Sequence, residues 1–106
     1  MIRVAVIYPN KQDQKFDSDY FINHHMPLVI EKYTPFGLVK TEVDTAKVKE
    51  GPQAAPYIAI GYMMFESTKS FMQAYKTVGH EIMPDIVNFT DIEPKIQISE
   101  YNIISL

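Results

Sequence analysis

The amino-acid sequence predicts a single α+β domain with the element order βαββαβ, a ferredoxin-like arrangement. Four stretches show the alternating or continuous apolar pattern of β-strands. Two further stretches, each lying between strands, repeat apolar residues at helical spacing. The chain contains no internal repeat and no low-complexity segment, so residues 1–106 are expected to form one domain.

The first strand and the first helix have clear boundaries in the sequence. Apolar residues alternate over residues 2–8, and Pro9 ends the run. Asp17 or Ser18 is suited to cap the N-terminus of a helix. We expect that helix to continue to about Thr34.

The remaining elements follow from similar signals. Alternation over residues 38–43 predicts a second strand, and a polar connection over residues 44–56 leads to a third strand at residues 57–65. Ser67 is placed to cap a second helix, and Gly79 to end it. Four apolar residues mark a last strand: Ile92, Ile96, Ile98 and Tyr101.

The third strand is apolar on both of its faces. One face carries Ile58, Ile60, Tyr62 and Met64, and the other carries Tyr57, Ala59, Met63 and Phe65. Two helices can cover only one face of a four-stranded sheet, so we expect a second copy to cover the other, giving a homodimer with a closed, dimeric α+β barrel. Met63 and Phe65 are considered as residues at the dimer seam. The alternative is that the long connection and the C-terminal segment cover this face.

Composition narrows the classes of function. The formal net charge is −3 and the ten Lys and Arg residues are scattered, so nucleic acid is not an expected partner. No apolar run reaches the length of a membrane span, no signal peptide is recognisable and cysteine is absent, so we expect a cytoplasmic protein with no membrane partner. The four glycines do not form a phosphate-binding loop, and no cofactor is expected.

The segment around His25 is the strongest candidate for chemistry. On a helical wheel, His25 lies near the centre of the apolar arc and His24 is rotated toward the polar side. Pro27 removes one backbone hydrogen bond and disfavours helical geometry at Met26, so we expect a kink and a pocket beside a buried base. The apolar arc comprises Phe21, Ile22, His25, Met26, Leu28, Val29 and Tyr33. The alternative is a core histidine that hydrogen-bonds a freed carbonyl.

Other residues are candidates for the same site. Tyr20 lies at the edge of the arc, and Asp17 is read either as a ligand-binding residue or as the helix cap. Tyr8, Tyr57 and Tyr62 carry hydroxyls on the predicted strands, and Gly61 leaves a gap beside them. Together they predict an apolar cavity for a small hydrophobic ligand, with ordinary core packing as the alternative.

No metal site is expected. His24 and His25 point about 100° apart on a helix, so they cannot easily coordinate the same metal ion. Glu81 and Asp85 are spaced one turn apart, but Pro84 interrupts the turn, and this stretch is read as a solvated acidic loop. His80 remains a candidate catalytic residue because it lies at a helix end.

Several separated stretches, in the same order along the chain, resemble the EthD family of dimeric α+β barrels. They are residues 2–9, Phe16-Asp17-Ser18-Asp19-Tyr20, His25-Met26-Pro27-Leu28, residues 56–61, and residues 80–92 continuing to Glu100. The chain departs from the usual family pattern at Pro84 and Val87. The matched stretches include His80 and also Asn88, a further candidate for ligand binding.

This resemblance implies one of two functions. The first is an oxidoreductase or related catalyst acting on a small hydrophobic or aromatic compound. In that hypothesis His25 moves a proton and tyrosine hydroxyls orient a substrate oxygen. The second is a non-catalytic protein that binds a small molecule in a degradation pathway.

Overall fold

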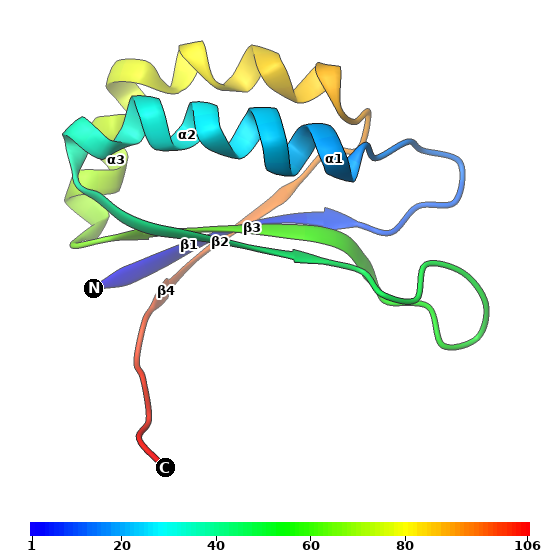
Figure 1. Ribbon diagram of the computed structural model, residues 1–106. Coiled ribbons are helices and arrows are strands. Elements are labelled where there is room, and N and C mark those ends of the chain that lie inside the picture. Colours follow the sequence, from blue (N-terminus) through cyan, green and yellow to red (C-terminus); the bar gives the residue numbers. More distant parts are fainter.

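A computed structural model describes residues 1–106 and confirms the predicted α+β class and element order. Four antiparallel strands form one sheet in the order β2-β3-β1-β4, with two rows of helical segments on one face (Figure 1). The strands are β1 (Ile2–Pro9), β2 (Leu38–Thr45), β3 (Tyr57–Phe65) and β4 (Lys95–Glu100). The last residues leave the sheet on the face opposite the helices (Figure 1). No helix has the length and apolar character needed to cross a membrane.

The first helical row changes its winding beside Pro27. It consists of α1 (Ser18–Tyr20), a π-helical turn η1 (Phe21–His25), α2 (Met26–Tyr33) and a short 3₁₀ turn η2 (Thr34–Phe36). The Asp17 side chain caps the start of this row by accepting a hydrogen bond from the Tyr20 amide.

The predicted loss of helical geometry at Met26 is wrong, because Met26 has helical dihedral angles of φ −64° and ψ −39°. The amide of Met26 donates to the carbonyl of Phe21, five residues back, which widens the turn just before the proline. Pro27 then falls in the first turn of α2, where a missing N–H is tolerated. The wider turn also rotates Ile22 out of the predicted apolar arc, and Ile22 is 44% exposed.

The second helical row consists of α3 (Thr68–Val78) and two 3₁₀ turns, η3 (Gly79–Glu81) and η4 (Met83–Asn88). The Ser67 hydroxyl accepts a hydrogen bond from the Ser70 amide, so the predicted cap of α3 is confirmed. Pro84 lies in the first turn of η4, where it starts the turn rather than interrupting it.

The two helical rows are tied together at one end. Phe16 forms an isolated antiparallel bridge with Thr90, and the Asp17 amide donates to the Phe89 carbonyl at 2.8 Å. The Thr90 hydroxyl adds a 2.6 Å hydrogen bond to the Lys15 carbonyl. These bonds join the start of the first row to the end of the second.

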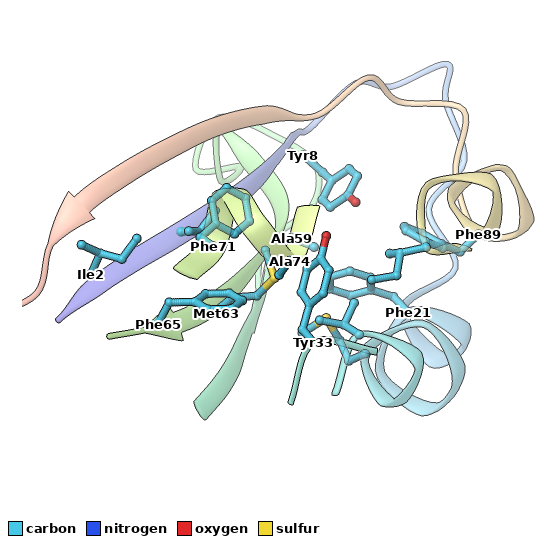
Figure 2. Packing of buried hydrophobic residues seen from close by; sticks show 14 of the residues in the cluster. Ile2, Tyr8, Phe21, Tyr33, Ala59, Met63, Phe65, Phe71, Ala74 and Phe89 are labelled. Atoms are coloured by element: carbon cyan, nitrogen blue, oxygen red, sulfur yellow. The ribbon is translucent and has the colours of Figure 1, made fainter. Parts of the chain in front are cut away.

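The core lies between the helices and the sheet (Figure 2). Met63 and Phe65 belong to this core, with 7% and 0% exposure, so they do not face a dimer seam. Strand alternation and the β1–β3 register place another set of residues on the face away from the helices: Ala5, Ile7, Ile60, Tyr62 and Met64.

Candidate active site

His25 is the last residue of the π-turn and faces the core. It is 5% exposed, and its Nδ1 atom lies 2.9 Å from Oδ2 of Asp85. His24 is exposed and lies against Tyr20, with ring centroids 5.0 Å apart. The predicted difference in burial between the two histidines is therefore confirmed.

Asp85 connects several of the polar groups at this site. Its Oδ1 atom accepts a 2.6 Å hydrogen bond from the Tyr20 hydroxyl and a 3.0 Å bond from the Asn88 amide. Its Oδ2 atom pairs with His25, so both carboxylate oxygens have partners. The interpretation of Asp85 as part of a solvated acidic loop is wrong, because its side chain is only 16% exposed.

A sequence signal for Asp85 exists. Buried Ile82 lies three residues before it and buried Phe89 four residues after it, which is the spacing of one helical face. The carboxylate therefore lies in an apolar stripe. Pro84 obscures this pattern in the sequence, because a proline at this position predicts an interrupted turn.

Hydrogen bonds set the direction of the pKa shift of Asp85, and burial sets that of His25. Burial by itself raises the pKa of Asp85, but hydrogen bonds from Tyr20, Asn88 and His25 outweigh it and hold that pKa below its usual 3.8. Burial lowers the pKa of His25 below its usual 6.5, and the nearby Asp85 carboxylate offsets only part of this effect. At neutral pH the imidazole is therefore mainly neutral. Because the partner of Nδ1 is an ionised carboxylate, Nδ1 carries the hydrogen and Nε2 is the basic nitrogen.

A pocket of about 70 Å³ lies beside His25, between the sheet and both helical rows. Its lining is mostly apolar, and no Lys, Arg, Asp or Glu contributes to it. The lining residues are Val6, Tyr8, Phe21, His25, Met26, Val29, Tyr33, Gly61, Met63, Phe71, Tyr75, Ile82, Met83, Ile86, Pro94 and Ile96.

Four polar groups of pocket-lining residues make no hydrogen bond within the chain: Nε2 of His25 and the hydroxyls of Tyr8, Tyr33 and the 43% exposed Tyr75. Every fully buried side-chain nitrogen or oxygen has a partner, so these four atoms must retain some accessible surface. Tyr8 and Tyr33 are only 1% and 3% exposed, and both line the pocket. Figure 2 shows their hydroxyls directed toward the middle of the core.

The predicted candidates Tyr8 and Gly61 thus lie at the pocket, although Gly61 does not leave a gap. A Cβ atom at position 61 would lie 3.1 Å from Cζ of Phe21, so the missing side chain makes room for that ring. Tyr20 and Asn88 contact Asp85 and do not line the pocket. Sequence reasoning did not select Tyr33 as a hydroxyl donor.

The other candidates lie elsewhere. Asp17 is the helix cap, and Tyr57 is 41% exposed at the start of β3. Tyr62 lies on the opposite face of the sheet, where its hydroxyl donates to Asp44 at 2.9 Å. His80 is exposed and outside the pocket lining. No three His, Cys, Asp or Glu side chains are grouped so that they could hold a metal ion.

The family model described as the EthD domain matches residues 10–93. The chain belongs to the EthD family. Among solved structures, an EthD-like protein from Ralstonia eutropha JMP134 is similar, with 33% identity and a TM-score of 0.84 over 93% of this chain and 89% of that one. No match was found among curated proteins.

Two more distant structures resemble the chain in fold alone. An EthD family protein from Bacillus halodurans C-125 is 20% identical, with a TM-score of 0.72 over 96% of this chain and 99% of that one. HapK from Hahella chejuensis is 11% identical, with a TM-score of 0.63 over 100% of this chain and 97% of that one.

Proposed function

We propose that this EthD protein binds a small hydrophobic or aromatic compound in the pocket beside His25 and that His25 acts on it as a general acid–base catalyst. The observation that carries the proposal is the His25–Asp85 pair. Nδ1 of His25 is bound to Asp85, so Nε2 is left without a partner, and His25 lines the pocket. A carboxylate at Nδ1 orients the ring and stabilises the imidazolium that forms when Nε2 takes a proton. Asp85, Tyr20 and Asn88 serve as positioning residues in this proposal.

An oxidoreductase reaction would need, besides this proton transfer, a nicotinamide or flavin to exchange electrons with the substrate, and the four glycines of this chain form no phosphate-binding loop to hold one. The alternative is a binding or accessory protein of a degradation pathway, which would hold the same class of compound without turnover. Its support is the largely apolar lining, which is typical of sites that bind small molecules.

The pocket can be tested by NMR with phenol as a probe. We expect titration with phenol to shift the imidazole signals of His25 and to leave those of exposed His24 and His80 nearly unchanged. His25→Gln should weaken phenol binding, whereas the matched variant His24→Gln should not. If phenol perturbs all three histidines weakly and equally, the proposed site is wrong.

The proposal includes a homodimer formed by the sheet face opposite the helices. Half-buried Ile7 and Ile60 form the apolar centre of this face, next to Arg3 stacked over Tyr62, whereas Ala5 and Met64 are already buried within the chain, at 8% and 1% exposure. Lys40, Glu42, Asp44 and Lys95 occupy register positions on the two outer strands of the same face. An apolar centre with a charged rim is the composition expected of a protein interface.

A further inference from the structure

We propose that the substrate is a neutral carbonyl compound with an acidic C–H next to its carbonyl group, whose oxygen is held by the hydroxyls of Tyr8 and Tyr33 while His25 moves the proton. The inference rests on the proposed function of His25 and deepens it by naming the substrate class, the reaction and two further catalytic residues.

The charge of the pocket points to a neutral ligand. No cationic side chain lines the pocket, so a carboxylate or phosphate would lose its hydration without gaining a counter-charge. A negative charge, that of Asp85, lies on the far side of the imidazole. An anionic ligand would therefore be opposed both by desolvation and by this carboxylate.

The two tyrosine hydroxyls point to an oxygen atom on the ligand. Both side chains are almost completely buried, and neither hydroxyl has a partner in the chain, so what remains accessible of each hydroxyl is free to meet a ligand in the pocket. A ligand acceptor at this place would give each hydroxyl the hydrogen bond that it lacks within the chain. Burial also raises the pKa of both groups, that of Tyr33 to about 12, so both remain hydrogen-bond donors.

Packing places Tyr8 and His25 around one space, and Tyr33 lines the same pocket. Tyr8 and His25 both pack against Phe21, with ring centroids 5.6 Å and 5.9 Å from it. They also both pack against Phe89, at 5.8 Å and 4.7 Å. One small molecule can therefore present a carbonyl oxygen to the hydroxyls and a neighbouring carbon to Nε2.

The reaction balances without an oxidant or a reductant. The C–H bond breaks, its proton passes to Nε2 of His25, and its electron pair forms a C=C bond while the carbonyl π electrons move to oxygen. The resulting enolate oxygen accepts hydrogen bonds from Tyr8 and Tyr33, which stabilise it as charge develops. The imidazolium, paired with Asp85, then returns a proton to carbon or to oxygen, giving exchange or a shift of the double bond.

The pocket size sets the choice of probes. A dry cavity of about 150 Å³ accepts benzene, and this pocket of about 70 Å³ is smaller. Met83 and Tyr75 line the pocket and are 43% exposed, so their movement can enlarge it. Cyclopentanone and the larger 2-indanone therefore bracket the expected range of substrate size.

The test is exchange of the C–H hydrogens of these two ketones in D₂O, followed by proton NMR. We expect the protein to accelerate exchange for at least one ketone above the rate in buffer. Tyr8→Phe and Tyr33→Phe should each stay folded and lower kcat, with Tyr8→Phe losing about 10²-fold, the effect of removing one oxyanion donor. The matched control Tyr57→Phe, outside the pocket, should exchange at the parent rate.

The outcomes separate this inference from the proposed function. If phenol shifts His25 but neither ketone is exchanged faster than in buffer, the substrate class is wrong and the binding site stands. If exchange occurs but is unchanged in both Tyr→Phe variants, the role of the hydroxyls is wrong. If neither phenol nor either ketone perturbs His25, both proposals fail. Benzoate should bind at least tenfold more weakly than phenol, and equal binding would contradict the neutral-ligand inference.

Discussion

The pair formed by His25 and Asp85 should behave as one energetic unit, which a double-mutant cycle can measure. The two atoms Nδ1 and Oδ2 are 2.9 Å apart, and the side chains are 6% and 16% exposed. A hydrogen bond to a charged group contributes about 1.5–3 kcal/mol when it is shielded from water. We therefore expect a coupling free energy of about 1.5–3 kcal/mol between His25→Ala and Asp85→Ala.

The assay is urea unfolding of the parent, the two single variants and the double variant at pH 7.5. Asp85→Ala also removes the acceptor of Tyr20 and Asn88, but this loss occurs with and without His25 and cancels in the cycle. A second cycle that pairs Asp85→Ala with His80→Ala is the control, because His80 is exposed and has no hydrogen bond to Asp85.

The control cycle should give a coupling within about 0.5 kcal/mol of zero. If the His25 cycle gives the same small value, the carboxylate does not hold the imidazole, and the proposed orientation of Nε2 loses its support.

Three further predictions test other parts of the structure. Because the pKa of His25 in the folded chain lies below its usual 6.5, the unfolded chain takes up the proton first, so stability should fall as pH decreases below about 6.5. Urea unfolding of His25→Gln should lack this loss, and an identical pH profile would show that His25 is not responsible. Ile7→Lys should give monomers in sedimentation experiments, because its neighbours across the strands, Ile60 and Lys95, offer the charge no partner; a dimer of unchanged stability would place the interface elsewhere. Gly61→Ala should lower the free energy of unfolding by about 1–3 kcal/mol because its Cβ would crowd Phe21, and an unchanged thermal midpoint would contradict the close contact.

The fold could be predicted because each element has a local signal. The alternation of apolar residues along β1 and the caps Asp17 and Ser67 depend on neighbours within a few positions in the sequence. The burial of His25 followed from the helical wheel for the same reason. The face of β3 that carries Met63 could not be assigned, because alternation identifies two faces without saying which one the helices cover.

The sequence predicts the histidine of the candidate site but not its carboxylate partner or its second tyrosine. His25 has a local signal, but its partner Asp85 lies 60 residues away, and the contact depends on how the two helical rows pack. Tyr62 and Tyr8 look alike in the sequence, yet they face opposite sides of the sheet. Which tyrosine hydroxyl meets the pocket is therefore a property of the tertiary structure.

The π-turn before Pro27 constrains how many residues lie between Tyr20 and His25 rather than which residues they are. Ile22, Asn23 and His24 are exposed within this turn, and their side chains look replaceable. Deleting any one of them would convert the wide turn to an ordinary helical one and rotate the preceding residues by about 100° relative to His25. Relatives that keep the same chemistry should therefore vary freely in these three side chains and still conserve the number of residues between Tyr20 and His25.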